Sequence, residues 1–236
     1  MNWEAVFFDF DGVILDSVDV KTKAFAKMFR KYGPEVERKV VEYHLNNGGV
    51  SRFDKFRYYY EEILNKPVNE KIIKTLSEQF SNLVIDGVLS SPFMPGAREI
   101  LESLKEKEIP CYIVSSTPYE EINLIVKKKG LKGYFKEVHG SPRKKWEICQ
   151  EIINRKDYNP QNCLLIGDAM SDYEAAQKNG IYFLGIVKEH EASPFPNGTP
   201  VSATVTVEFS GLPEWHNPQP AISTTVNGSL NKKRSV

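Results

Sequence analysis

The feature that most constrains this chain is a short apolar run that ends in two carboxylates. Residues 5–8 are all apolar, and Asp9, Asp11 and Gly12 follow within four positions. The run predicts a buried strand and the glycine predicts a turn. Open α/β sheets bind ligands beyond the carboxyl ends of their strands. Because neighbouring carboxylates repel one another, the pair favours a Mg²⁺ site in which one acid is also a nucleophile. The alternative is a polar turn after a core strand.

Three further segments have related features. The apolar run 110–114 ends in Ser115, Ser116 and Thr117, just before Pro118. Hydroxyls and backbone N–H groups at such a strand-to-helix turn can hold phosphate oxygens. The alternative is that these hydroxyls only cap the helix that follows.

The third segment is basic and the fourth is acidic. Lys144 and Lys145 open an apolar-periodic helix, where a cation is unfavourable against the helix dipole unless an anion is bound nearby. Solvated surface lysines are the alternative. The apolar run 163–166 ends in Gly167 and Asp168, with Asp172 four residues on. Carboxylates from separate strands are the hard oxygen ligands that Mg²⁺ requires, whereas a helix-capping Asp168 is the alternative.

The order of elements predicts an α/β protein with a doubly wound parallel sheet. Strands are expected near residues 5–9, 110–115, 136–139, 162–167 and 181–187, and helices near 94–108, 118–130, 143–156 and 171–179. Between residues 17 and 91 the pattern is helical only, which predicts an inserted helical bundle of about 75 residues with turns near Gly33, Gly48 and Pro67. Residues 203–209 could form a last edge strand, and we expect 213–236 to be a disordered tail.

Composition restricts the partners. The 236 residues carry 31 basic and 31 acidic side chains, so nothing indicates a nucleic-acid or membrane partner. No apolar run approaches the ~20 residues of a membrane span. The three cysteines, Cys111, Cys149 and Cys163, fall on expected core positions and are interpreted as small core residues in a reducing compartment. The expected location is the cytoplasm.

Taken together, the four segments resemble the haloacid dehalogenase-like (HAD) superfamily, in particular the branch with phosphoglycolate phosphatase and β-phosphoglucomutase. The resemblance covers residues 4–210, and the opening Asp-Phe-Asp-Gly-Val-Ile-Leu-Asp-Ser at 9–17 is close to the usual form of the family. It implies a Rossmann-like core in residues 1–16 and 92–212 and a helical cap in residues 17–91. Such a cap closes over the active site and excludes water.

The resemblance also implies roles. Asp9 would attack phosphorus and form an aspartyl-phosphate, and Asp11 would act as acid and then as base. Mg²⁺ would be held by Asp9, the Asp11 backbone carbonyl and Asp168, with Asp172 orienting the metal's shell. The phosphoryl oxygens would be held by residues of the second and third segments: Ser115, Ser116 and Lys145. Lys145 is preferred to Lys144 because it stands at the start of the apolar helix pattern.

The expected cap contains one candidate for substrate recognition. The glycine pair at 48–49 precedes Arg52, and the loop could place this guanidinium over the site to hold a second anionic group of the substrate, with Gly49 allowing the approach. A helix–helix turn followed by a solvated basic face is the alternative, and it is the interpretation adopted for Lys55 and Arg57. The five aromatic residues of this region are expected to form cap core rather than a stacking platform, because those at 53, 56 and 60 share helical spacing: Phe53, Phe56, Tyr58, Tyr59 and Tyr60.

His44 and His139 are interpreted as structural, since spacing gives neither a catalytic partner. The sequence therefore predicts a Mg²⁺-dependent phosphatase of small phosphorylated metabolites. Two alternatives stay open: a phosphosugar mutase of the β-phosphoglucomutase type, and a non-catalytic binding protein on the same scaffold. The substrate and the oligomeric state do not follow from the sequence.

Overall fold

The computed structural model describes residues 3–205. In this range six parallel strands form one sheet in the order β3-β2-β1-β4-β5-β6. The strands are β1 Ala5–Phe8, β2 Cys111–Pro118, β3 Glu137–Ser141, β4 Cys163–Gly167, β5 Tyr182–Ile186 and β6 Val201–Ser202. The predicted doubly wound parallel sheet is therefore confirmed. Because the strand order reverses at β1, the carboxyl ends of β1 and β4 form the crevice in which such sheets bind ligands.

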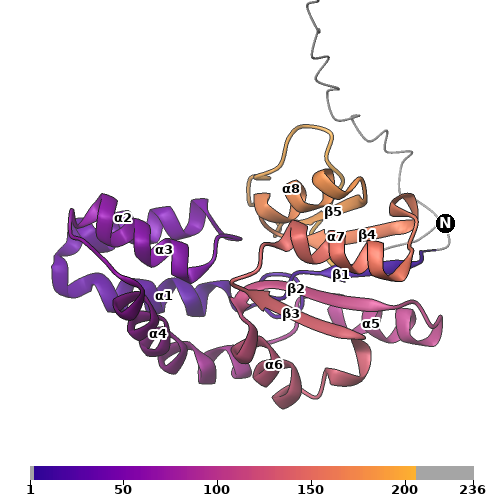
Figure 1. Ribbon diagram of the computed structural model, residues 1–236, viewed down its shortest axis with the longest axis horizontal. Helices are drawn as coiled ribbons and strands as arrows, with labels where there is room; N and C mark the ends of the chain where they lie inside the picture. Colours follow the sequence, from indigo (N-terminus) through magenta and orange to yellow (C-terminus); the bar gives the residue numbers. More distant parts are fainter. Residues whose placement is uncertain (1–2, 206–236) are drawn as a thin grey trace, which may run out of the picture.

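Helices cover both faces of the sheet (Figure 1). Alternate side chains of β1 explain this, since Val6 and Phe8 belong to one buried cluster and Ala5 and Phe7 to another. The first cluster includes residues of α5 (Ala97–Glu106) and α6 (Tyr119–Lys128), and the second includes residues of α7 (Lys145–Lys156) and α8 (Met170–Asn179). All four residues of β1 are buried, which is typical of a central parallel strand.

Four more helices lie between β1 and α5 and gather at one end of the molecule (Figure 1). They are α1 Val18–Phe29, α2 Pro34–Asn46, α3 Arg52–Tyr58 and α4 Glu70–Ser90. A 3₁₀ turn, Arg30–Tyr32, follows α1, and a π-helical turn, Tyr59–Ile63, follows α3. Below, these helices and their connections are called the helical insert (residues 18–90). The division of the chain into two domains at the predicted boundaries stays a prediction.

Local signals explain where the insert helices begin. The Ser51 hydroxyl accepts a hydrogen bond from the Asp54 N–H at the start of α3, and the Asn69 side chain accepts one from the Ile72 N–H at the start of α4. Gly33 precedes Pro34 with a φ of 103°, a backbone conformation that favours glycine. The predicted turns at these places therefore coincide with the observed breaks between helices.

The apolar stripe predicted for α3 is partly wrong. Phe56 and Tyr59 are buried as expected, but Phe53 and Tyr60 are only half-buried and Tyr58 is exposed. The buried face instead carries Arg52, Lys55, Phe56 and Tyr59, at spacings of three, one and three residues. Two cations thus point into the molecule with the aromatic rings. The physical reason is that both cations find buried polar partners, described below, which a pattern of apolar residues does not reveal.

Other expectations concern smaller features. All three cysteines are buried and free, as predicted for core residues. The last strand within residues 3–205 is β6, which ends at Ser202, earlier than the expected edge strand at 203–209. Most of that expected strand and the whole expected tail at 213–236 lie outside the described residues. Among the helices of the described range, none is long and apolar enough to cross a membrane.

Candidate active site

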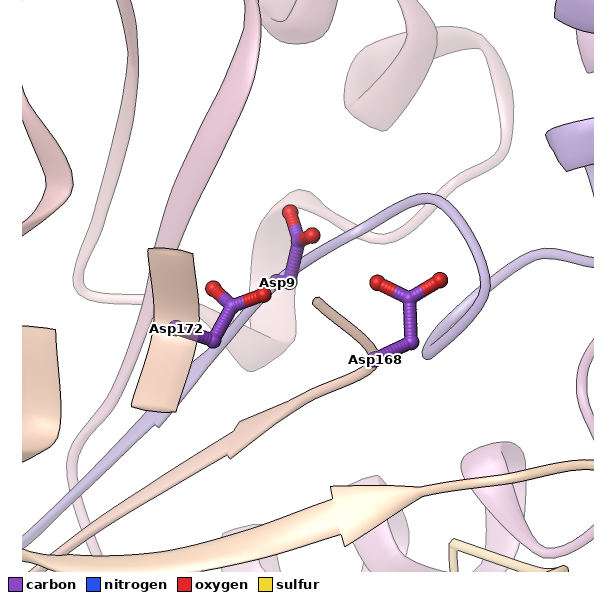
Figure 2. A group of neighbouring side chains, drawn as sticks. All are labelled: Asp9, Asp168 and Asp172. Carbon is purple, nitrogen blue, oxygen red and sulfur yellow. The ribbon is translucent and has the colours of Figure 1, made fainter. Parts of the chain in front are cut away.

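Three carboxylates meet at the carboxyl edge of the sheet. Asp9 follows β1, Asp168 follows β4, and Asp172 lies in the first turn of α8. Figure 2 shows these side chains around one space, and one carboxylate oxygen of each lies within 4.8 Å of the others. We call these three residues the carboxylate corner. Its assembly follows from topology, because β1 and β4 are paired neighbours in the sheet.

Lys145 is the cation that offsets this charge. Its Nζ lies 2.8 Å from Asp9 Oδ2 and 2.6 Å from Asp172 Oδ1, and the side chain is buried. Burial alone would lower the pKa of Lys145, but the Asp172 and Asp9 carboxylates raise it above its usual value. By contrast, Lys144 is exposed and pairs with Asp54. The structure therefore brings Lys145, and not Lys144, to Asp9, which explains a lysine at the start of α7.

One ammonium does not neutralise three carboxylates. Burial and the neighbouring Asp9 and Asp172 charges raise the pKa of Asp168, and burial also raises the pKa of Asp172. A cluster of hard oxygen donors with excess negative charge suits a divalent cation such as Mg²⁺. Both oxygens of Asp172 are already engaged, by Lys145 and by the Ala169 N–H at 3.2 Å. Asp9 is engaged in the same way, by the Phe10 N–H at 2.7 Å and by Lys145 at 2.8 Å, so these contacts do not separate the two acids as metal donors.

Gly12 makes this close approach possible. Its φ is +79°, and a Cβ built on it would lie 2.1 Å from Asp168 Oδ2. Any other residue would therefore collide with the carboxylate and also strain the backbone. The glycine that indicates a turn in the sequence is thus required by the packing of the β1 loop against Asp168.

Asp11 lies outside the corner and has its own partners. Its carboxylate accepts hydrogen bonds from Lys21 Nζ, from the Ser17 hydroxyl at 2.6 Å and from the Thr117 hydroxyl at 3.0 Å. Burial would raise the pKa of Asp11, but Lys21 and these hydrogen bonds outweigh it and hold the pKa below its usual value. Asp11 is therefore held ionised in this arrangement.

Sequence reasoning missed Lys21. It lies on α1, one helical turn after Ser17, and its Nζ also donates to Thr117 Oγ1 at 2.7 Å. The sequence indicates Lys21 only through its spacing of four residues from Ser17. That spacing places the lysine beside the motif at 9–17 only if α1 is known to begin there. A lysine on an amphipathic helix otherwise resembles any solvated surface residue.

The hydroxyl segment lies in β2, which continues to Pro118 rather than ending at the expected position. Ser115 is buried, and its hydroxyl accepts a hydrogen bond from the Thr117 N–H at 3.1 Å. The Ser116 hydroxyl donates to the Gly49 carbonyl, so it joins the sheet to the helical insert. A Cβ on Gly49 would lie 1.7 Å from Ser171 Oγ, which explains why this loop approaches the core through a glycine.

A cavity of about 630 Å³ lies between the sheet edge and the helical insert. The core contributes both acids of the first motif, the hydroxyls of Ser116 and Thr117, and Asp168. The insert contributes six polar or charged residues to the same cavity: Asp19, Lys21, His44, Asn46, Arg52 and Lys55. The cavity therefore joins the carboxylate corner to cations that come from the insert.

Arg52 reaches this cavity with its guanidinium already paired. The Nη1 and Nη2 atoms lie 2.8 and 2.6 Å from the two oxygens of Glu121 on α6, and Nη1 also donates to the Ser81 hydroxyl at 2.8 Å. The side chain is buried and packs 4.6 Å from the centre of the Phe80 ring. Arg52 thus links the insert to the core, a role that the sequence analysis does not predict.

The interpretation of Lys55 as part of a solvated face is wrong. Only 2% of its surface is exposed, and its Nζ lies 2.8 Å from Nδ1 of His44, which is also buried. The corresponding interpretation of Arg57 agrees with the structure, because this partly exposed side chain pairs with Glu70. Helical rotation explains the difference, since Lys55 is three residues after Arg52 on the same buried face of α3.

His139 is placed away from these groups. Its Nε2 lies 2.9 Å from Glu137 Oε2, and Glu137 also pairs with Arg155 of α7. Glu137 therefore links β3 to α7, and His139 supports this acid, in agreement with a structural role.

Comparison with known proteins decides the family. The family model for haloacid dehalogenase-like hydrolases matches residues 6–186, from β1 to the end of β5. The chain belongs to this family. The match includes the carboxylate corner, Lys145 and the whole helical insert, so the site described above lies within the shared region of this hydrolase family.

Relatives and structural neighbours agree with this assignment. A phosphorylated carbohydrates phosphatase of Thermotoga maritima is 28% identical over 190 residues, covering 75% of this chain and 82% of the relative. A phosphoglycolate phosphatase of Pseudomonas putida is 22% identical, covering 84% and 72%. The crystal structure of a β-phosphoglucomutase from Clostridium difficile superposes with a TM-score of 0.69 at 23% identity, covering 87% of this chain and 92% of that one.

Proposed function

We propose that this phosphoric monoester hydrolase of the HAD family releases phosphate from a small phosphorylated metabolite through an aspartyl-phosphate on Asp9, with Mg²⁺ as cofactor. One observation carries the proposal. Asp9 is buried at the end of β1, contacts the Lys145 ammonium at 2.8 Å and borders a cavity of about 630 Å³. That volume suits a small-molecule substrate. The names of the two phosphatase relatives support the same reaction class.

Asp9 is held in a fixed orientation for attack. Its Oδ1 accepts a hydrogen bond of 2.7 Å from the Phe10 N–H, and its Oδ2 faces Lys145. In the first step a carboxylate oxygen of Asp9 bonds to phosphorus while the bond from phosphorus to the leaving oxygen breaks. In the second step water attacks phosphorus, inorganic phosphate leaves and the Asp9 carboxylate is restored.

Asp11 serves these two steps in opposite protonation states. It gives a proton to the leaving alkoxide and then takes one from the attacking water. The contact with Lys21 favours the ionised form, which the second step requires. A negatively charged phosphoester bound beside Asp11 raises its pKa, because like charges disfavour ionisation. Substrate binding thereby promotes the protonated form that the first step requires.

Lys145 and hydroxyl groups of β2 would hold the transferred phosphoryl group. Lys145 already lies beside the attacking oxygen, so its charge acts where negative charge develops. Ser115 and Ser116 are proposed to orient the phosphoryl oxygens. Of the two, Ser116 borders the cavity directly, whereas Ser115 is buried against the Thr117 N–H.

The residues present fit Mg²⁺. The carboxylates of Asp9 and Asp168 and the backbone carbonyl of Asp11 would hold the ion, and Asp172 would orient the surrounding groups through Lys145 and the Ala169 N–H. When bound, the ion offsets the charge on the carboxylates and on the phosphoryl group. In the insert, Arg52 and Gly49 remain proposed substrate contacts, although Arg52 must share its guanidinium with Glu121.

A phosphate-release screen over phosphorylated metabolites tests the proposal. Wild-type protein, Asp9→Asn and Asp86→Asn would be compared with Mg²⁺ and with EDTA. Asp86 is an exposed acid on α4, so its variant controls for the loss of one charge. We expect release that requires Mg²⁺, survives in Asp86→Asn and is lost in Asp9→Asn. Release that persists in Asp9→Asn would contradict the proposed nucleophile, and no release from any ester by folded wild-type protein would contradict the phosphatase itself.

A further inference from the structure

Lys55 differs from the other cations near the site in its partners. Lys145 contacts two carboxylates, Arg52 contacts Glu121 and Lys21 contacts Asp11. Within residues 3–205, no carboxylate lies within ion-pair distance of Lys55 Nζ. Its neighbours are the neutral groups His44 Nδ1 at 2.8 Å, the Gly48 carbonyl at 3.4 Å and the His44 carbonyl at 3.5 Å. Lys55 is therefore a buried cation whose charge this part of the chain does not match.

The neighbouring histidine does not remove this imbalance. Because Nδ1 of His44 accepts from the Lys55 ammonium, its proton lies on Nε2, which is buried and has no hydrogen-bond partner among the described residues. Burial, followed by the charge of Lys55, lowers the pKa of His44 to about 3. The imidazole is thus neutral at physiological pH, and any positive charge of the pair is carried by Lys55.

The neutral acceptors and the Phe25 ring, whose centre is 5.8 Å from Nζ, satisfy the hydrogen bonds of Lys55 but leave its charge unmatched. A fully buried lysine is rare unless it is paired, because an ammonium loses its hydration without compensation. Burial lowers the pKa of Lys55 to about 7, in line with that cost. Lys55 also borders the cavity that contains Asp9. An anion in this cavity would supply the missing partner.

We infer that Lys55 binds a second anionic group of the substrate, a carboxylate or a second phosphate, in the cavity that contains Asp9. This inference rests on the proposed function and narrows its substrate class to phosphoesters that carry another negative charge. The reacting phosphoryl group belongs to Asp9 and Lys145, whereas Lys55 would hold the part of the substrate that remains after hydrolysis. The charge that the ammonium meets there replaces the hydration that it loses on burial.

Matched substrates and variants test this specificity. Phosphoglycolate would be compared with its neutral amide, and glycerol bisphosphate with glycerol phosphate, as two pairs in which one member lacks the second anionic group. Each pair would be measured with wild-type protein, Lys55→Met and Arg57→Met. Arg57 lies two residues away on α3 and pairs with Glu70 at the surface, so Arg57→Met controls for the loss of a positive charge. Steady-state kcat and KM give the preference for the charged member of each pair.

We expect wild type and Arg57→Met to prefer the charged member, and Lys55→Met to lose about 10- to 100-fold of this preference, mainly through KM. The pair that loses more identifies the second group as carboxylate or phosphate. Wild type that shows no preference in either pair would overturn the inference, even if Lys55→Met fails to fold. An unchanged preference in folded Lys55→Met would also overturn it, while leaving the phosphatase intact. Failure of wild type on all esters would overturn the proposed function itself.

Discussion

The carboxylate corner of the core and the two buried cations of α3, Arg52 and Lys55, carry unmatched charge of opposite sign. In the corner, three acids lie close together and one ammonium contacts two of them, Asp9 and Asp172, so negative charge is in excess. On α3, Arg52 is matched by Glu121 but Lys55 has only neutral neighbours, so positive charge is in excess. Both regions border one cavity. Under the two proposals above, a divalent cation would offset the first imbalance and an anionic group of the substrate would offset the second.

The largest expected effect comes from removing Lys145, which contacts two acids of the carboxylate corner. Lys145→Met leaves Asp9 and Asp172 without their shared ammonium and removes positive charge beside the transferred group. We expect kcat to fall by about 10²- to 10³-fold, the range for losing one electrostatic donor at a reacting centre. Phosphate-release kinetics measure this loss.

Lys144→Met is the matched control, because this neighbouring lysine is exposed and contacts Asp54 instead. Its kcat should stay close to that of wild type. Equal losses of kcat in the two variants would contradict a specific role for the contacts of Lys145 with Asp9 and Asp172.

On the other side of the cavity, the expected effect is on stability. Glu121→Gln removes the charge that matches Arg52 while keeping the size of the side chain. Because this leaves a buried guanidinium without its carboxylate, we expect the free energy of unfolding to fall by about 3 kcal/mol. Urea unfolding, followed by circular dichroism, measures the change.

Glu70→Gln provides the comparison for that variant, since it breaks the Arg57–Glu70 pair at the surface of the same insert. Exposed pairs of this kind contribute little, so no measurable change is expected. If Glu121→Gln were as stable as Glu70→Gln, the Arg52–Glu121 pair would contribute nothing measurable to the free energy of unfolding.

The sequence predicts the carboxylate corner better than it predicts the buried cations of α3. Asp9 and Asp168 each stand next to an apolar run, and a parallel sheet brings the ends of the neighbouring strands β1 and β4 together, whereas Lys145 is expected at the site only through the family resemblance. The proximity of the two acids could therefore be predicted without side-chain geometry. The position of Lys55 could not, because it depends on the rotation of α3 and on His44 from another helix.

The α3 stripe shows the same limit in detail. Apolar spacing selects Phe53 and Tyr60 as core, whereas the structure buries Arg52 and Lys55 in their place. Periodicity registers which residues are apolar and gives no information on whether a buried charge has a partner. Lys21 escaped notice for a related reason, since Asp11 and Thr117 meet it only after α1 packs against the sheet.

The smallest expected effect concerns Lys21 and depends on pH. Because the pKa of Asp11 is lowered in the folded protein, its ionised form contributes stability above the unfolded pKa of about 3.9, and this contribution is lost as the pH falls through the folded value. Lys21→Met removes the main group that lowers this pKa. We expect the variant to be less stable than wild type by about 2 kcal/mol at neutral pH, with the difference shrinking in acid.

Thermal and urea unfolding across a pH series measure this difference, with Lys23→Met on the exposed face of α1 as control. An NMR titration of the Asp11 carboxyl should show its pKa rising in Lys21→Met. A pKa that stays low in that variant would mean that the hydroxyls of Ser17 and Thr117 alone keep Asp11 ionised.

The central claim is that Asp9 carries the phosphoryl group between the two steps. The most direct measurement mixes the protein with a substrate from the screen, quenches in acid within the first turnover and analyses the peptides by mass spectrometry. The account predicts an added phosphoryl group on Asp9, which appears in wild type with Mg²⁺ and is absent from Asp9→Asn. Rapid phosphate release without any adduct at Asp9, or with the adduct on another residue, would contradict it.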